Sequence, residues 1–311
     1  MNLIYMAKPT YGGWVSFTAH LANKYNYKIY KITKRTEKKT RTFGYGAEYQ
    51  NLTIEDALKL PNILITAIDK KYYEYLSQFP DSTSLVIHDP TEIKGTSTQP
   101  VIDNLHRLNI FTIRKTVHEL LKTKFNKENT FKHHPLYEYP FETKIKNRNV
   151  SISRVDFDKN THEIIKANDN LPENLQVQIY GAKNDLYVYH CLHNKMKLDL
   201  DKYYKGTFKK GFDELSNILS TAKFVVDLSA IKGDGGGSQY TFLEAIYQNC
   251  VLILNKKWVD NVETEFKHSH NCYVVEDAEE LENLLKSNPP TEHILKNARE
   301  LLQPHINVEW N

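Results

Sequence analysis

The chain has 311 residues, of which 40% are hydrophobic and 25% are charged. This composition excludes a disordered or low-complexity chain, and the length favours two domains over one. The three cysteines follow no pattern, no apolar run approaches the roughly 20 residues of a membrane helix, and Met1–Met6 lacks the features of a signal peptide. These observations predict a soluble chain in a reducing cytoplasm, without membrane insertion.

The first half of the chain alternates short apolar runs with stretches of helical period, which indicates βαβ units and a parallel sheet. The predicted strands are Asn2–Met6, Lys28–Ile32, Ile63–Ala67, Ser84–His88 and Ile110–Ile113. The predicted helices are Val15–Asn23, Ile54–Lys59, Lys71–Gln78 and Lys115–Lys122. A polar, aromatic stretch, Asn126–Asn149, then breaks the periodicity and is interpreted as a linker.

The pattern starts again after this stretch, so the same kind of unit is built twice. The predicted strands are Val150–Ser153, Val177–Tyr180, Phe224–Leu228 and Val251–Leu254, with helices at Thr161–Asn168, Phe212–Thr221 and Tyr240–Gln248. We expect an α/β fold of two Rossmann-like, doubly wound domains, 1–145 and 146–311, that face each other across a cleft, with a C-terminal helix that packs back on the first domain. In such sheets ligands bind beyond the carboxyl ends of the strands.

Charge is distributed unevenly along the chain, although the net charge is only +3. Residues 1–150 carry 23 Lys and Arg against 14 Asp and Glu, whereas the remainder carries 18 against 24. Within residues 28–41, where Glu37 is the single acid, Lys34, Arg35, Lys38 and Lys39 are candidate contacts to a polyanionic acceptor such as nucleic acid. A solvated surface loop is the alternative interpretation.

Three loops between a strand and a helix carry the residue types that bind phosphates. In the first, Gly12 and Gly13 let the backbone approach a ligand and leave helix amides free for an anion, although a plain tight turn has the same pattern. In the second, Arg154 and Lys159 suit the clamping of a diphosphate by one forked and one point charge. The alternative for this pair is a charged surface loop.

The third loop holds four of the chain's 12 glycines within residues 233–237. Backbone amides there suit a phosphate at the start of the next helix, and Glu244, one turn into that helix, suits a ribose diol. The donor-binding candidates of this region are Gly235, Gly236, Gly237, Ser238, Tyr240, Thr241 and Glu244. The alternative is a flexible surface loop followed by an ordinary glutamate.

The order of these motifs resembles the donor half of the GT-B retaining glycosyltransferases. The resemblance rests on Arg-x-x-x-x-Lys at Arg154 and Lys159, on the glycine-rich loop, and on Phe-Leu-Glu-Ala around Glu244. It implies that Arg154 and Lys159 hold the diphosphate of a nucleotide sugar and that Glu244 holds the ribose. Gly236 departs from the family, which usually has a second glutamate at that position, so recognition of the sugar hydroxyls falls to the amides of Gly236 and Gly237.

A narrower resemblance, to the bacteriophage DNA α-glucosyltransferases that modify 5-hydroxymethylcytosine, extends thinly over most of the chain. The resemblance rests on residues 5–8 together with Gly12 and Gly13, on Ile87-His88-Asp89, and on residues 240–244. The resemblance implies that His88 and Asp89 lie at the reacting centre, with Asp89 as the base or charge stabiliser, and that the setting is a host cytoplasm. A strand-end histidine followed by a helix-capping aspartate is the alternative.

The resulting hypothesis is a transferase that moves a sugar from a nucleotide diphosphate sugar, UDP-glucose or similar, to a hydroxyl acceptor. The expected acceptor is a 5-hydroxymethylpyrimidine in double-stranded phage DNA. Because the target base must leave the stack, Tyr11 and Trp14 are candidate wedges at the acceptor. A glycan-building transferase and a non-catalytic nucleotide- or nucleic-acid-binding protein are the alternatives. No permanently bound cofactor and no metal are expected, because 199–201 and the histidine pair 133–134 lack the remainder of a metal site.

Overall fold

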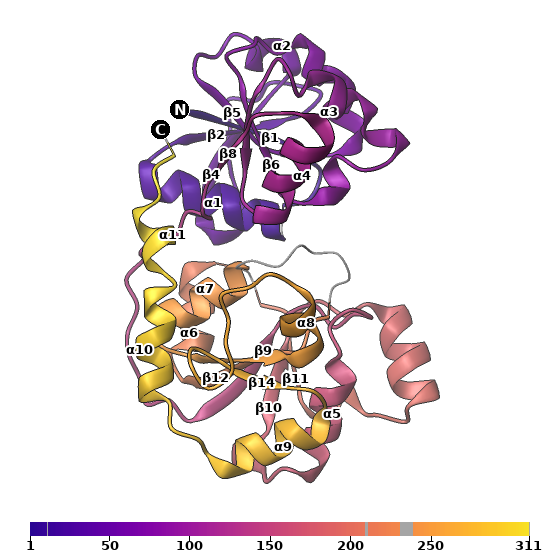
Figure 1. Ribbon diagram of the computed structural model, residues 1–311, viewed down its shortest axis with the longest axis vertical. Helices are drawn as coiled ribbons and strands as arrows, with labels where there is room; N and C mark the ends of the chain where they lie inside the picture. The colour runs from indigo at the N-terminus through magenta and orange to yellow at the C-terminus, as the bar shows by residue number, and fades with distance from the viewer. Residues whose placement is uncertain (11, 209–210, 231–238, 311) are drawn as a thin grey trace. The chain divides into compact units, whose positions relative to one another are not determined.

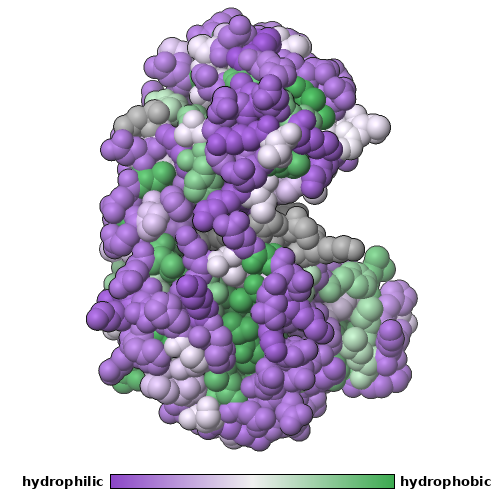
Figure 2. All heavy atoms as spheres, in the orientation of Figure 1, coloured by the Kyte–Doolittle hydropathy of each residue, from purple (hydrophilic) through white to green (hydrophobic). Residues whose placement is uncertain are grey.

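The computed structural model describes residues 1–10, 12–208, 211–230 and 239–310, and these form two compact α/β units (Figure 1). Unit 1 contains Met1–Glu138 and the C-terminal residues from Pro304 to Trp310, and unit 2 contains the described residues from Tyr139 to Gln303. Hydrophilic side chains cover most of unit 1 on the face shown in Figure 2, whereas a band of hydrophobic side chains is visible on unit 2. Within the described ranges, no helix is both long and apolar enough to cross a bilayer.

Unit 1 is built, within the described residues, on an eight-stranded sheet with the order β3-β4-β2-β1-β5-β6-β7-β8. Neighbouring strands are parallel except for the antiparallel pair β3 and β4. The bounds are β1 Asn2–Met6, β2 Lys28–Ile32, β3 Thr40–Thr42, β4 Glu48–Leu52, β5 Ile63–Ile68, β6 Ser84–Ile87, β7 Asn109–Thr112 and β8 Thr130–Phe131. Every position of the apolar strand β5 is buried, as expected for a parallel strand covered on both faces.

Three helices of unit 1 have a local signal at one end. Asn26 and Asn126 adopt the left-handed conformation that ends a helix, after α1 and α4 respectively. Thr53 caps α2 by accepting a hydrogen bond from the backbone of Asp56. The bounds are α1 Gly13–Tyr25, η1 Gly44–Gly46, α2 Ile54–Ala57, η2 Lys70–Gln78, η3 Pro90–Glu92, η4 Thr96–Thr98, α3 Gln99–Asn104 and α4 Lys115–Phe125.

Unit 2 is built, in the part of the chain that is described, on a six-stranded sheet with the order β11-β10-β9-β12-β13-β14, and all neighbours are parallel. The strands are β9 Arg148–Ile152, β10 Val177–Tyr180, β11 Tyr204–Gly206, β12 Ala222–Asp227, β13 Val251–Asn255 and β14 Tyr273–Val275. The helices are α5 Thr161–Asn170, η5 Glu173–Leu175, η6 Tyr187–Lys195, η7 Leu200–Lys202, α6 Phe212–Leu219, α7 Tyr240–Tyr247, α8 Lys256–Asn261, α9 Ala278–Ser287 and α10 Glu292–Glu300.

Both sheets are doubly wound, so each has a point at which the strand order changes direction. In unit 1 the chain passes from β1 to β2 on one side and continues with β5 on the other. In unit 2 it passes from β9 to β10 on one side and continues with β12 on the other. The loops that follow β1, β5, β9 and β12 therefore lie where doubly wound sheets bind their ligands.

The C-terminal segment completes the core of unit 1. This segment follows α11, Gln303–Asn307, and its Trp310 is 1% exposed. The indole packs against Phe17 and Phe111, with ring centroids 5.2 and 5.5 Å apart, and Lys24 hydrogen-bonds to the carbonyl oxygen of His305 over 3.4 Å. Residues from both ends of the described chain therefore form one core.

The stretch interpreted as a linker, Asn126–Asn149, is more ordered than its composition suggests. It contains β8 and the start of β9, and its His134, Leu136 and Tyr139 are buried. The backbone N–H of Leu136 donates to the carbonyl of His305 over 3.1 Å. Part of the segment is therefore held in place by residues far away in the sequence.

Candidate functional site

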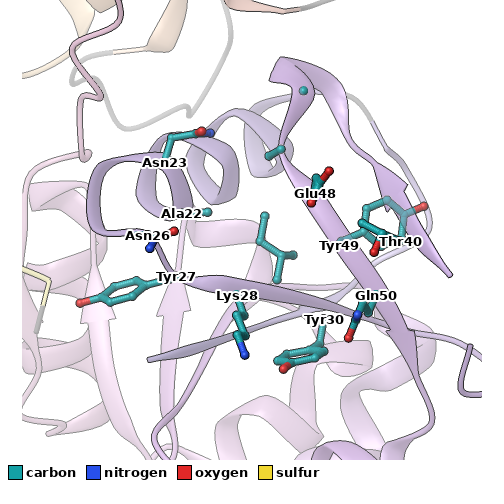
Figure 3. A pocket seen from close by; sticks show the side chains of 13 residues that line it. Ala22, Asn23, Asn26, Tyr27, Lys28, Tyr30, Thr40, Glu48, Tyr49 and Gln50 are labelled. Carbon is teal, nitrogen blue, oxygen red and sulfur yellow. The ribbon is translucent and has the colours of Figure 1, made fainter. Parts of the chain in front are cut away.

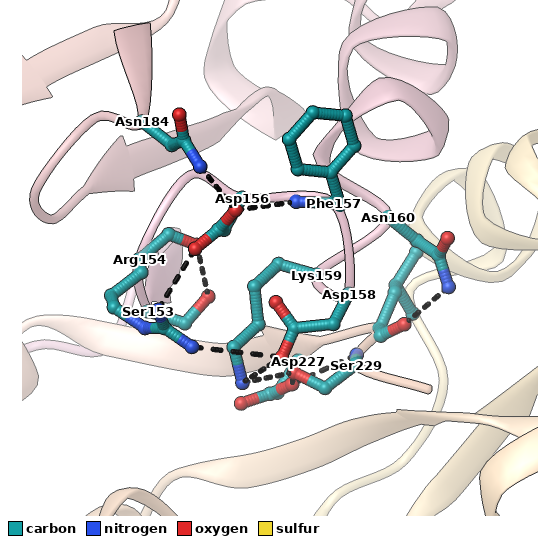
Figure 4. A network of polar contacts seen from close by, with 11 residues as sticks. Ser153, Arg154, Asp156, Phe157, Asp158, Lys159, Asn160, Asn184, Asp227 and Ser229 are labelled. Carbon is teal, nitrogen blue, oxygen red and sulfur yellow. Dashed lines mark hydrogen bonds and ion pairs between the residues drawn. The ribbon is translucent and has the colours of Figure 1, made fainter. Parts of the chain in front are cut away.

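The loop between β9 and α5 presents Arg154 among carboxylates of its own loop (Figure 4). The Arg154 guanidinium lies 2.8 Å from Asp156 and 3.6 Å from Asp158, and its side chain is 60% exposed. Partial burial would raise the pKa of Asp156, but hydrogen bonds from Phe157 N–H and the Asn184 amide, together with the Arg154 charge, hold that pKa below its ordinary value. The loop thus fixes an accessible forked cation.

Lys159 lies at the end of the same loop and is buried, with 8% of its surface exposed. Its ammonium donates to the hydroxyl of Ser229 over 2.9 Å, and that hydroxyl in turn donates to Asp227 at the end of β12 (Figure 4). Asn160 makes a second link by donating to the carbonyl of Leu228 over 2.9 Å. Because β9 and β12 are the strands at which the order changes direction, these bonds join the two loops at the expected binding point.

Gly181, directly after β10, allows the Arg154 loop to lie against the end of the neighbouring strand. Its φ is +140°, and a Cβ atom there would lie 1.9 Å from the carbonyl oxygen of Ser153. Only glycine combines this backbone conformation with such a close approach. Neither Gly181 nor the Ser229 and Asp227 pair belongs to the motif residues that the sequence analysis selects.

The helix that follows β12, α7, carries the other predicted donor residues. Glu244 is 1% exposed. Tyr240 is also buried, and its burial raises the pKa of its phenol, with a smaller contribution from Glu244. Thr241 is half-buried on the first turn. The predicted contacts Gly235, Gly236, Gly237 and Ser238 lie outside the described residues.

In unit 1 the loop after β1 leads into α1. Gly12 has a φ of +97°, which favours glycine, and its carbonyl accepts from the backbone N–H of Ser16 over 3.0 Å. Gly12 and Gly13 are exposed, and Trp14 on the first turn is half-buried. Tyr11 lies outside the described residues.

His88 follows β6 and is 7% exposed, packed edge-on against Phe17 with centroids 4.9 Å apart. Burial lowers the pKa of His88 to about 4, so its ring is neutral at pH 7. The carbonyl of Thr66 accepts from Nε2 over 2.8 Å, which places the proton on Nε2 and leaves Nδ1 as an acceptor. A ring with so low a pKa is a poor general base, and it orients a hydroxyl better than it deprotonates one.

Asp89 caps the short helix η3, since its Oδ1 accepts from the backbone N–H of Thr91 over 2.8 Å. The structure therefore contains the helix cap that was the alternative interpretation of Asp89. Because Asp89 is only half-buried, its carboxylate is also accessible for the role of base or charge stabiliser. Glu92, at the end of η3, is 4% exposed, and its Oε2 accepts from the backbone N–H of His88 over 3.2 Å. The sequence analysis does not single out Glu92.

A cavity of about 630 Å³ lies beside these residues in unit 1. Its lining comes from the starts of α1 and η2 and from the loop around η3, and it includes Trp14, Asp69, Tyr73 and Glu92. Asp69 follows β5 and accepts from the backbone N–H of Lys8 over 2.6 Å, which ties together the two loops at which this sheet changes direction.

The basic segment after β2 forms a second concave surface, of about 400 Å³. Lys34 and Arg35 line it together with Lys31 and Arg41, which the sequence analysis does not select as contacts. Lys38 and Lys39 are exposed. The structure thus gathers cations from β2, from β3 and from the loop between them.

A third cavity, of about 520 Å³, lies at the other end of the same strands (Figure 3). It is lined by the last turn of α1, by Lys28 and Tyr30 at the start of β2, and by Glu48 and Gln50 of β4. Because doubly wound sheets bind ligands at the carboxyl ends of their strands, this cavity is a poor candidate for the main site.

The residues weighed as metal ligands have structural partners. Asp199 accepts from the backbone N–H of Asp201 over 3.0 Å, and Asp201 pairs with Lys183 over 2.7 Å. Among the residues with described positions, no three His, Cys, Asp or Glu side chains are grouped to hold a metal ion.

Comparisons with known proteins identify the fold. No protein-family model matches the sequence, and no curated protein sequence matches it. Anabaena HepE, solved with UDP and glucose, superposes on 98% of this chain and 96% of its own, with a TM-score of 0.70 and 14% identity. An α-glucosyltransferase solved with UDP and a 13-mer DNA containing a HMU base covers 98% and 95%, with a TM-score of 0.69 and 14% identity.

A third similar structure is Staphylococcus aureus TarM, which covers 83% of this chain and 56% of its own, with a TM-score of 0.58 and 14% identity. Together with the two parallel-dominated sheets, these likenesses show that the chain has the GT-B fold, as the motifs predicted.

Proposed function

We propose that this chain is a glycosyltransferase that moves a sugar from a nucleotide diphosphate sugar, UDP-glucose or a close relative, to a hydroxyl group. The observation that carries the proposal is the link from Lys159 to Ser229 at the point where the strand order of unit 2 reverses. It fixes a cation at the position where doubly wound sheets bind phosphates, beside the accessible fork of Arg154.

The donor half would work by charge neutralisation. The acceptor oxygen forms a bond to the anomeric carbon, the bond from that carbon to the diphosphate breaks, and the nucleoside diphosphate leaves with the electron pair. Arg154 and Lys159 stabilise the leaving charge, and the buried Glu244 holds the ribose. HepE and the α-glucosyltransferase were both solved with UDP, which supports a uridine donor.

In unit 1 the acceptor hydroxyl gives up its proton as the new bond forms. Asp89 is the proposed base or charge stabiliser, and His88 orients the hydroxyl through Nδ1, because its Nε2 is committed to Thr66. By the family resemblance, the sugar keeps its anomeric configuration.

The proposed acceptor is a hydroxymethylated pyrimidine in double-stranded DNA. The cluster of Lys31, Lys34, Arg35 and Arg41 offers a surface for phosphates, and one structure of the same fold was solved with DNA. TarM was solved with a glycerol-linked GlcNAc, which favours a surface or lipid-linked glycan as the second candidate acceptor.

The deciding experiment incubates the protein with radiolabelled nucleotide sugars and with hydroxymethylated DNA, unmodified DNA or no DNA. Label in hydroxymethylated DNA alone is the expected result. Label in a glycan would support the second candidate acceptor. If no sugar is transferred while the nucleotide still binds, the result would favour a non-catalytic binding protein.

Variants separate the two halves of the proposed site. Asp89→Asn keeps the side-chain shape and removes its charge, so we expect transfer to be lost while the donor affinity stays unchanged. Glu244→Gln is expected to weaken nucleoside binding and to leave inhibition by pyrophosphate nearly intact. Near-normal turnover of Asp89→Asn would move the catalytic role elsewhere.

A further inference from the structure

Glu92 is a buried carboxyl group with one oxygen in use and one to spare. Its Oε2 accepts from the backbone N–H of His88, and the Trp14 indole and the backbone of Asp89 also lie against the carboxyl group. Its Oε1 is buried and has no hydrogen-bond partner in the part of the chain that the structure describes. A buried polar atom without a partner costs about 1–3 kcal/mol, so its retention calls for an explanation.

The surroundings of Glu92 supply one. It lines the cavity of about 630 Å³ at the carboxyl ends of the unit 1 strands, together with Trp14 and Tyr73. Three exposed lysines, Lys70, Lys71 and Lys94, line the same cavity. A group that enters the cavity would meet the Trp14 indole, the Tyr73 phenol and the buried Glu92 beside them, and lysine ammonium groups near the solvent.

We propose that Glu92 is an acceptor-binding, specificity-determining residue. It holds the His88 backbone and the Trp14 indole in place, and it offers Oε1 to an uncharged hydrogen-bonding group of the acceptor. A phosphate of the acceptor contacts the lysines. The inference rests on the proposed transferase function. Glu92 would then select the acceptor, a role separate from those of the donor residues and of His88 and Asp89.

The protonation state of Glu92 fits this role. Burial, reinforced by the charge of Asp89, raises the pKa of Glu92 to about 8, so the carboxyl group is mostly neutral at pH 7. A neutral carboxyl group both donates and accepts, and it therefore pairs with a hydroxyl or an amide edge without the desolvation cost of a charge. The titratable and charged groups around it are His88, Asp89, Asp69, Tyr73, Lys70, Lys71, Lys94 and Arg114.

The test measures kcat/KM for the acceptor against pH in the wild type, Glu92→Gln and Glu92→Leu, with Glu74→Gln as the control at an exposed glutamate of the same unit. In the wild type we expect kcat/KM to fall about tenfold per pH unit above about 8, as the carboxyl group ionises. Glu92→Gln keeps a neutral hydrogen-bonding group and is expected to lack this fall. Glu92→Leu is expected to raise the acceptor KM at least about tenfold while the donor Kd stays unchanged.

The outcomes separate this inference from the proposed function. If the wild type transfers sugar and Glu92→Gln shows the same alkaline fall, or Glu92→Leu has an unchanged acceptor KM, the role of Glu92 is wrong and the function stands. If Glu92→Leu does not fold, as judged by its thermal transition and donor binding, the pH profile of Glu92→Gln decides alone. If the wild type transfers no sugar to any acceptor, both fall together.

Discussion

The two loop regions at the carboxyl ends of the sheets hold their polar groups in opposite ways. In unit 2, Arg154 and Lys159 are surrounded by Asp156, Asp158 and the Ser229 hydroxyl, so each cation has a compensating partner. In unit 1, His88 and Glu92 are buried with few polar partners, and burial shifts the pKa of each toward the neutral form.

The difference indicates which kind of chemical group each region can bind. A cation that is paired with a carboxylate can exchange that partner for a phosphate. Groups neutralised by burial respond to pH and recognise uncharged partners. The comparison therefore predicts that unit 2 is sensitive to geometry and counter-charge, and that unit 1 is sensitive to pH.

The largest expected effect comes from the geometry of unit 2. In Gly181→Ala the new Cβ would lie 1.9 Å from the carbonyl oxygen of Ser153, at a φ of +140°. We expect about 1–3 kcal/mol from backbone strain and a similar further loss from the clash, measured by urea unfolding. Gly206→Ala is the control, because its φ of +100° imposes strain while no described atom beyond its chain neighbours lies within 4 Å of the new Cβ. Equal losses in the two variants would contradict the close approach.

The second prediction separates the two cations of unit 2. Lys159→Met removes a buried donor and leaves Ser229 and Asp227 without it, so we expect a loss of about 1–3 kcal/mol in unfolding free energy. Arg154→Met removes an exposed ion pair, and its expected loss is below about 1 kcal/mol. Donor affinity, measured by calorimetry, is expected to fall about 10- to 100-fold in both. Unchanged affinity in both variants would remove the donor site from this loop.

The third prediction concerns the pH response of unit 1. The pKa of Glu92 rises from 4.5 to about 8 on folding, so its contribution to stability is complete below pH 4.5 and is lost as the pH rises through 8. The unfolding free energy of the wild type relative to Glu92→Gln is expected to fall between pH 5 and 8, by at most about 1.4 kcal/mol per pH unit. His88→Gln tests the opposite sign: because the pKa of His88 is lowered to about 4, its contribution is lost below pH 6.5. A pH-independent difference would show that neither group is neutralised by burial.

The smallest effect per residue is expected at the basic segment of unit 1, where the cations are exposed. Neutralising Lys34, Arg35, Lys38 and Lys39 together is expected to weaken duplex binding and to make its salt dependence shallower, by about 0.9 in the log–log slope for each phosphate that the variant no longer neutralises. Donor affinity is the internal control and is expected to stay unchanged. An unaltered slope would show that these side chains only face water.

Much of the fold could be predicted from the sequence, because short runs rich in β-branched and aromatic residues alternate with stretches of helical period. Asn2–Met6, Lys28–Ile32 and Val177–Tyr180 have the predicted bounds. One missed element is β3, Thr40–Thr42, whose three residues are all exposed and carry no apolar signal. The sequence prediction also stopped before α9, Ala278–Ser287, although this helix buries Leu281 and Leu285 on one face. Lys70–Gln78 is helical as expected but has 3₁₀ geometry.

The site was predictable where one short segment carries it and unpredictable where two segments meet. The five-residue spacing of Arg154 and Lys159 is visible in the sequence, whereas the Ser229 hydroxyl that holds Lys159 lies 70 residues further along the chain. Glu92 gives no local signal, because an ordinary surface glutamate at the end of a short helix has the same pattern. Only burial distinguishes the two.

The C-terminal segment that closes the core of unit 1 has a consequence for synthesis. Phe17 and Phe111 emerge from the ribosome long before Trp310, with all of unit 2 made in between. Until then the apolar place that the indole fills stays uncovered, while unit 2 has its whole sequence available. Unit 2 is therefore free to reach its native state first, and unit 1 exposes apolar surface until the segment that carries Trp310 has been made.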